Sequence, residues 1–105
     1  MSTRSLEAIE DPGTPLYFSA ASIWEMAIKE ALGKLKMPGD LVSTMEERGF
    51  QELPVVSRYA IVAGALPPHH GDPFDRMLVA QAQSEGLTVV TNDARIAAYD
   101  VTLLW

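Results

Sequence analysis

Short apolar segments alternate with longer segments of helical periodicity, and this alternation most constrains the fold. Residues 16–19 (LYFS), 53–56 (LPVV), 87–91 (LTVVT) and 101–104 (VTLL) fit strands, because they are short, apolar and rich in aromatic or β-branched residues. Strands that alternate with helices pair in parallel, since a parallel connection needs a crossover. Residues 1–105 are therefore expected to form one α/β domain of three layers, a parallel sheet with helices on both faces.

Capping and breaking residues delimit the helical segments. Asp72-Pro73 is a strong helix start, because the aspartate can accept first-turn N–H groups and proline at the first helical position loses no bond. Gly86 is the matching stop. Trp24 falls in an apolar helical stripe and is expected in the core or at an interface. The expected helices cover residues 3–10, 22–32, 40–48, 57–66 and 73–85, with a short one through Ala98.

Charge and cysteine content narrow the functional classes. The 105 residues carry a formal net charge of −6, which argues against a broad basic surface for nucleic acid. Divalent cations held by carboxylates would reverse the negative electrostatic potential locally. The absence of cysteine excludes disulfides, thiolate metal sites and a cysteine nucleophile, and it fits the cytoplasm. No signal peptide is recognisable, and no apolar run approaches the ~20 residues of a membrane helix, so no membrane partner is expected.

Three acidic residues lie at positions where the functional residues of parallel sheets are commonly found. Glu25 comes soon after strand 16–19, Asp93 directly follows strand 87–91, and Asp75 opens the helix before that strand. The carboxyl ends of parallel strands share one edge, so the three could converge. Carboxylate oxygens suit Mg²⁺ or Mn²⁺, which can activate a water and stabilise phosphoryl charge. From spacing alone, three acids among fourteen remain a weak signal.

Each of these acids also has a structural explanation. Ser22 and Glu25 have the spacing of a capping box. Asp75 in a first helical turn would favour the helix dipole, and Asp93 would start a helix. Asp72 is favoured as a helix cap rather than a ligand.

Two longer sequence segments are more specific. SAASIWEMAIKEALGKL and LPPHHGDPFDRMLVAQAQSEGLTVVTNDARIAAY closely resemble the PIN-domain family, in particular the VapC-type toxin ribonucleases of type II toxin–antitoxin pairs. The resemblance implies a metal-dependent endoribonuclease that uses Mg²⁺ or Mn²⁺, cuts RNA, often forms a homodimer and is held inactive by a cognate antitoxin. By motif, it assigns metal binding and catalysis to Glu25 in SIWE, Asp75 in DPFDRMLVAQA and Asp93 in TND, with Asp72 as a weaker ligand.

Other polar residues near these motifs receive lesser roles. Thr91 could orient a ligand or a water, and Arg76 and Arg95 could meet RNA phosphates, although surface solubility is a common explanation for a single arginine. His69 and His70 could ligate a metal or shuttle protons. Because they follow Pro-Pro, a solvated loop without a catalytic role is the favoured expectation.

The chain departs from the family at its beginning. Family members begin with a strand that ends in a metal-binding aspartate and lies in the middle of the sheet, whereas residues 3–10 match the segment after the first strand and helix. We therefore expect an N-terminally truncated PIN-like domain in which two flanking strands lack a partner. A catalytically inactive PIN-like module that binds an antitoxin or a dimer partner is the alternative, and a general phosphoesterase is a third possibility.

Overall fold

The computed structural model describes residues 1–105 and shows an α/β fold of helices and short parallel strands. The fold class expected from the sequence is confirmed. None of the helices is long and apolar enough to cross a membrane. The elements along the chain are α1 (Thr3–Glu10), β1 (Leu16–Ser19), α2 (Ala20–Ala31), α3 (Leu41–Glu47), β2 (Phe50–Leu53), α4 (Ser57–Ala65), α5 (Pro73–Glu85), β3 (Thr88–Val90), the 3₁₀ helix η1 (Ile96–Ala98) and β4 (Thr102–Leu104).

The four strands form two separate parallel pairs. β1 pairs with β2, with Leu16 opposite Phe50 at the start of the ladder. β3 pairs with β4, with Thr88 opposite Thr102. No ladder joins the two pairs, so the strands form two small sheets instead of the single sheet that alternation suggested.

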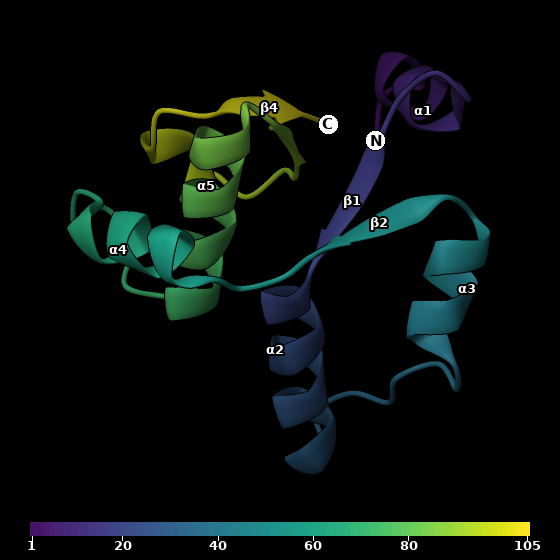
Figure 1. Ribbon diagram of the computed structural model, residues 1–105, viewed down its shortest axis with the longest axis horizontal. Coiled ribbons are helices and arrows are strands. Elements are labelled where there is room, and N and C mark those ends of the chain that lie inside the picture. Colours follow the sequence, from purple (N-terminus) through teal and green to yellow (C-terminus); the bar gives the residue numbers. More distant parts are fainter.

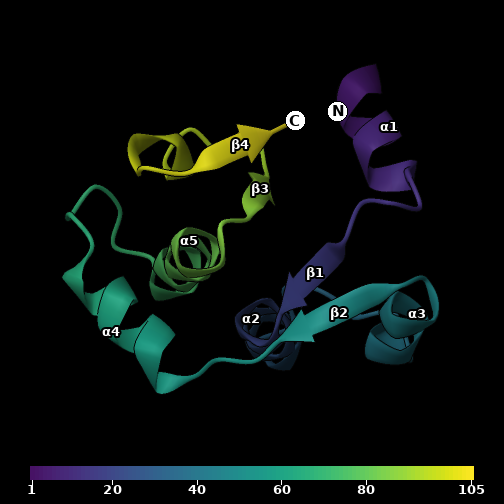
Figure 2. The ribbon, with the colours of Figure 1, turned by 45° about the horizontal axis from the view of Figure 1, so that its top comes forward.

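A cleft of about 610 Å³ lies between the two sheets. β1 and β3 are the inner strands in Figures 1 and 2, and every residue of both strands lines the cleft, together with residues of α5. The inner edges of both strands therefore have no strand partner in this structure.

The core is small and lies mostly in the second half of the chain. Twelve of the 105 residues are buried, and the tightest apolar cluster joins Val79 of α5 to Ile96 and Tyr99 around η1. Leu66, Val101 and Leu103 pack against this cluster. Helix α5 is therefore the central element, and its position determines where its first-turn side chains lie.

The first strand after α3 lies earlier than the sequence suggested. The expected strand 53–56 is wrong, because β2 occupies Phe50–Leu53. Gly49 adopts a φ of 90° between α3 and β2, a left-handed conformation that glycine accepts without a steric penalty. Pro54 has no N–H to continue the ladder, and the two valines after it are exposed.

Helix α2 also begins earlier than expected. It starts at Ala20, and its cap is Ser19, whose Oγ accepts a hydrogen bond from the Ala21 N–H at 3.1 Å. Ser22 lies inside the helix, so the proposed capping box with Glu25 does not form. The local signal was ambiguous because Ser19 and Ser22 both precede a helical apolar stripe.

The apolar stripe of α2 faces solvent. Trp24 and Leu32 are each 63% exposed, and Ile28 between them is 38% exposed. A core position for Trp24 is therefore wrong. Its ring makes an edge-on contact with Phe74 of α5 at a centroid distance of 5.2 Å, so α2 and α5 touch through the rim of this stripe.

A polar triad fastens α4 to the end of α5. The Tyr59 hydroxyl donates to Glu85 Oε1 at 2.6 Å, and Arg58 Nη2 donates to the same oxygen at 2.5 Å. These two hydrogen bonds hold the pKa of Glu85 below its usual value, whereas the bond to Glu85 raises the pKa of Tyr59. The helix ends one residue later at Gly86, whose φ of 66° confirms the expected stop.

Candidate functional site

Asp72 caps α5 and fixes its first turn. Its Oδ1 accepts hydrogen bonds from the backbone N–H groups of Phe74 and Asp75 at 2.8 and 3.1 Å, and Pro73 takes the first helical position. The expected cap is confirmed. The other carboxylate oxygen, Oδ2, makes no hydrogen bond, so Asp72 keeps one oxygen available beside the Asp75 carboxylate.

His70 is bound to Asp75 across the start of this helix. Its Nε2 lies 2.7 Å from Asp75 Oδ2, and the two side chains are only 11% and 18% exposed. The expectation that His70 lies in a solvated loop is therefore wrong. His69 does remain exposed and makes an edge-on contact with the Tyr99 ring.

Arg76 and Tyr99 hold the loop that presents His70. The Tyr99 hydroxyl donates to the His70 carbonyl oxygen at 2.9 Å and accepts from the His70 N–H at 3.0 Å. The guanidinium of Arg76 donates to this hydroxyl as well. It also donates to the backbone carbonyls of Ala63, Leu66, Pro67 and His70 at 2.8 to 3.4 Å. Both terminal nitrogens of Arg76 are thus engaged inside the protein, which gives this residue a structural role.

The first turn of α5 and its loop bring three possible metal ligands together. His70, Asp72 and Asp75 each offer one ligand atom, and these atoms lie within 4.8 Å of one another. Two carboxylates and one imidazole can together bind a divalent cation. The carboxylate oxygens suit Mg²⁺ and Mn²⁺. The chemistry of this donor set therefore fits a divalent cation.

Asp93 is not one of these three residues, but it lies close enough for the charge of this group to affect its pKa. Arg95 binds it through Nε to Oδ1 at 3.1 Å and through Nη2 to Oδ2 at 2.9 Å. These bonds lower the pKa of Asp93 to about 2, and the nearby charge of His70 acts in the same direction. Asp93 raises the pKa of Arg95, and Asp75 and Asp72 contribute to the same shift. The acids and Arg95 thus form one electrostatic neighbourhood.

Thr91 positions the Asp93 loop. Its Oγ1 accepts a hydrogen bond from the Asp93 N–H at 3.1 Å, while Asp93 Oδ1 accepts one from the Arg95 N–H at 2.9 Å. The two bonds turn the chain sharply after β3. Thr91 therefore orients Asp93, and Asp93 starts the turn into η1.

Glu25 is not part of the group of three. Its carboxylate forms an ion pair with Lys29 one helical turn later at 3.2 Å, and its side chain is 24% exposed. Such surface pairs contribute little stability. α2 packs against α5 near the Trp24–Phe74 contact, which places Glu25 on an element that adjoins the site. The ligand role of Glu25 stays a prediction, as do those of Asp75 and Asp93.

His70 is the candidate-site residue to which the sequence prediction assigned no role. Its only local signal is a histidine two residues before an Asp-Pro helix start and five before a first-turn aspartate. That spacing lets a loop side chain fold back over the first helical turn. The signal was hard to recognise because the two adjacent histidines differ in environment: His69 is exposed, whereas the His70 side chain is largely buried.

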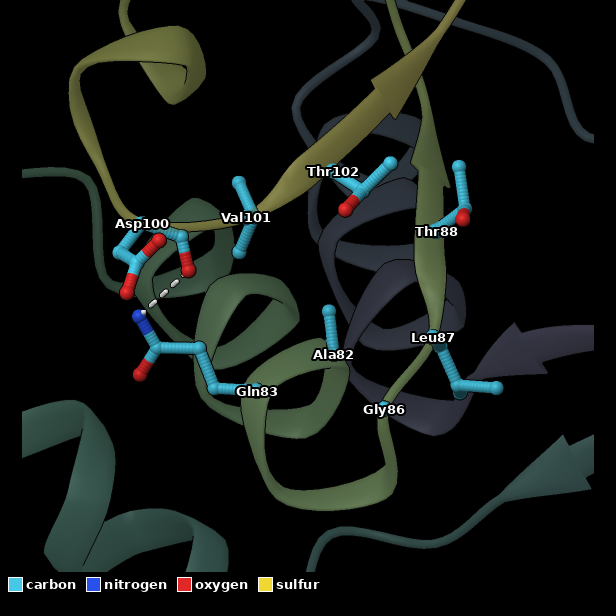
Figure 3. Close-up of a pocket in the computed structure, with 8 residues that line it drawn as sticks. All are labelled: Ala82, Gln83, Gly86, Leu87, Thr88, Asp100, Val101 and Thr102. Atoms are coloured by element: carbon cyan, nitrogen blue, oxygen red, sulfur yellow. Dashed lines mark hydrogen bonds between the residues drawn. The ribbon is translucent and has the colours of Figure 1, made fainter.

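A second hollow lies at the other end of α5 and offers no comparable chemistry. Figure 3 shows this pocket of about 280 Å³, where Gln83 donates to the backbone oxygen of Asp100 at 3.1 Å. Asp100 is its one ionisable residue, and it is exposed. The candidate site is therefore better placed at the first turn of α5.

Comparison with known proteins gives the family. No curated protein matches the chain. The family model for the PIN domain matches residues 2–101, which include α5 with its first-turn acids and the Asp93 turn after β3. The α/β fold, the parallel strands and this match agree, and the chain belongs to the PIN-domain family.

Proposed function

We propose that the protein is a Mg²⁺- or Mn²⁺-dependent endoribonuclease, the toxin component of a VapC-type toxin–antitoxin pair. Membership of the PIN-domain family implies a nuclease-type function in general. The observation that carries the finer proposal is the group of His70, Asp72 and Asp75 at the start of α5, with Asp93 in the same electrostatic neighbourhood.

The residues take distinct roles in this proposal. Asp75 and Asp93 hold the metal, together with Glu25 from α2, and Asp72 contributes its free oxygen. A bound divalent cation would supply a water of lowered pKa and positive charge for the phosphoryl group. His70 keeps the Asp75 carboxylate oriented through the 2.7 Å contact.

RNA contacts would come from residues that remain accessible. The Arg95 side chain is 64% exposed, so it can exchange its bond to Asp93 for one to an RNA phosphate. Arg76 is an RNA contact by sequence prediction only, because its hydrogen bonds inside the protein involve both terminal nitrogens. Thr91 acts by holding the Asp93 turn.

The partners are an RNA substrate, a cognate antitoxin and a second copy of the chain, all in the cytoplasm. The exposed stripe of Trp24, Ile28 and Leu32 supports a protein partner, because contiguous apolar surface on a helix marks interaction sites. The net charge of −6 favours a basic antitoxin segment. The same stripe supports the alternative of an inactive module that only binds its partner.

Cleavage of a labelled structured RNA by the purified 105-residue chain tests the proposal. We expect products with Mg²⁺ or Mn²⁺, none with EDTA, and at least a 100-fold lower rate for Asp75→Asn on the scale of catalytic-group removal. Asp40→Asn is the matched control, since Asp40 is exposed and makes no side-chain cap bond at α3.

The outcomes separate the candidate functions. Undiminished cleavage by Asp75→Asn would overturn its ligand role. Cleavage of single-stranded DNA and small phosphate esters as readily as RNA would favour a phosphoesterase. Tight binding of a basic partner without metal-dependent cleavage of RNA would favour the inactive module.

A further inference from the structure

The Arg95 side chain holds both carboxylate oxygens of Asp93. Its Nε donates to Oδ1 at 3.1 Å, and its Nη2 donates to Oδ2 at 2.9 Å. Oδ1 also accepts a hydrogen bond from the Arg95 backbone N–H at 2.9 Å. An ionised carboxylate offers about four lone-pair positions, so most of the acceptor capacity of Asp93 is in use. The oxygens that Asp93 would offer to a divalent cation are therefore bound to a guanidinium.

The guanidinium of Arg95 also interacts with the acids at the start of α5. Its hydrogen bonds to Asp93 raise the pKa of Arg95 most, and the charges of Asp75 and Asp72 raise it as well. Arg95 thus places one positive charge among the carboxylates that would hold a cation. Like charges at short separation repel each other. Arg95 and a divalent cation near Asp93 and Asp75 would therefore compete for the same negative charge.

The ion pair between Arg95 and Asp93 can be exchanged easily. The Arg95 side chain is 64% exposed and the Asp93 side chain is 28% exposed. Ion pairs at the surface contribute little stability, because water competes for both groups. The turn does not depend on the guanidinium, since Thr91 Oγ1 accepts from the Asp93 N–H and Asp93 Oδ1 accepts from the Arg95 N–H. The Arg95 side chain can thus leave Asp93 while the backbone stays in place.

Arg95 suits this exchange better than Arg76, the other arginine near the site. Both terminal nitrogens of Arg76 donate to protein atoms, so moving its side chain would leave backbone carbonyls without donors. A guanidinium binds carboxylate and phosphate groups in the same way, through two parallel N–H groups. The Nε and Nη2 groups that now bind Asp93 therefore fit two oxygens of a phosphodiester once they are released.

We propose that Arg95 is a phosphate ligand under the control of the metal site: it holds Asp93, gives up this carboxylate when Asp93 binds a divalent cation, and then binds a phosphodiester of the RNA. The inference rests on the proposed metal role of Asp93 and adds an order of events to it. Coupling between two ligands is reciprocal, so a phosphodiester on Arg95 raises the affinity for the cation by the same factor. Cation and RNA thus bind cooperatively.

Calorimetric titration with Mn²⁺ tests the competition. Arg95→Gln removes the guanidinium and keeps the backbone N–H that Asp93 Oδ1 accepts. We expect Mn²⁺ affinity to rise about fivefold in this variant, the upper range for an exposed ion pair. Asp93→Asn is expected to lower Mn²⁺ affinity at least about tenfold. Arg48→Gln is the matched control, because it removes the same charge from an exposed position after α3 and should leave the affinity unchanged.

NMR of the Arg95 Nε–H group follows the release directly. With Mg²⁺, we expect its resonance to move toward that of Arg48, whose side chain is exposed. Dimethyl phosphate, a simple phosphodiester, should then shift the Arg95 resonance in the presence of Mg²⁺ and leave it nearly unchanged in its absence. In Asp93→Asn, dimethyl phosphate should shift this resonance without Mg²⁺, because an uncharged amide holds a guanidinium less strongly than a carboxylate does.

Release of Arg95 by Mg²⁺, together with tighter Mn²⁺ binding in Arg95→Gln, would establish the proposal. If Mn²⁺ binds equally to Arg95→Gln and Arg48→Gln while Asp93→Asn weakens binding, the proposal fails and the metal role of Asp93 stands. A response to dimethyl phosphate that is equal with and without Mg²⁺ would also overturn it. Unchanged Mn²⁺ affinity in Asp93→Asn would overturn the metal role of Asp93 and this inference with it. If Arg95→Gln does not fold, the NMR measurement on the unaltered chain decides.

Discussion

His70 Nε2 and Asp75 Oδ2 lie 2.7 Å apart, although one belongs to a loop and the other to the first turn of α5. The loop side of this contact is fixed by Tyr99, which bonds both backbone groups of His70. The carboxylate is thus held in one orientation by residues that are distant in sequence. Partners of this kind tune the ligands they contact.

Replacing His70 is expected to weaken metal binding. His70→Leu removes the contact to Asp75 while keeping a side chain of similar bulk, and we expect Mn²⁺ affinity to fall about tenfold or more. Calorimetric titration of the purified chain with Mn²⁺ measures this. His69→Leu is the matched control, because His69 is exposed and does not contact Asp75. Equal Mn²⁺ affinity in the two variants would show that His70 does not position the carboxylate.

Arg76 is expected to stabilise the fold more than any other basic residue. Arg76→Lys leaves several of the backbone carbonyls between α4 and α5 without a donor, because an ammonium group cannot reach all the acceptors of a planar guanidinium. We expect the free energy of unfolding to fall by about 2 kcal/mol. Urea unfolding measures it, and Arg4→Lys on the exposed face of α1 should change it little. A loss no greater than in the control would contradict this assignment.

The triad of Arg58, Tyr59 and Glu85 predicts a pH window for stability. Because the folded-state pKa of Glu85 lies below 4.5, its contribution is present above that pH and is lost as the pH falls through the folded value. Because the folded-state pKa of Tyr59 lies above 10.0, the contribution of its hydroxyl is complete below that pH and is lost as the pH rises through the folded value.

Two substitutions check this window. Glu85→Gln should lower the free energy of unfolding at pH 7, and its difference from the unaltered protein should shrink toward pH 3. Tyr59→Phe should remove the loss above pH 10. Glu47→Gln, at the exposed end of α3, is the control. A difference for Glu85→Gln that stays constant from pH 7 to 3 would be the contrary result.

Arg95 is expected to control the protonation of Asp93. Arg95→Gln removes the two guanidinium bonds, so the pKa of Asp93 should rise from about 2 toward its ordinary 3.8. Carbon-13 NMR of the carboxyl group follows this titration directly. Arg48→Gln, after α3, should leave the pKa of Asp93 unchanged. An Asp93 pKa that stays near 2 in Arg95→Gln would show that another donor depresses it.

Local chemistry determined the parts of the fold that the sequence predicted well. Both ends of α5 follow from Asp72-Pro73 and Gly86, because capping involves only residues within one helical turn. The position of β2 could not be predicted in this way. LPVV is more β-branched than FQEL, yet the turn at Gly49 and the missing N–H of Pro54 place the ladder on the latter.

The features that the sequence did not predict depend on packing between residues that are far apart in the chain. The role of His70 depends on Tyr99, which lies 29 residues later. A core position for Trp24 is wrong because periodicity identifies which face of a helix is apolar but does not show whether another element covers that face. The expected convergence of the acids is partial, since Asp93 shares the charges of the Asp75 group while Glu25 pairs with Lys29.

The division into two strand pairs has a consequence for cooperativity. Both strands of each ladder come from the same half of the chain: β1 and β2 precede residue 54, and β3 and β4 follow residue 87. Contacts between α2 and α5 are the main packing that couples the halves. Hydrogen exchange is therefore expected to show two unfolding units of different stability. The half built around Val79, Ile96 and Tyr99 should open last, because it holds the tightest core cluster.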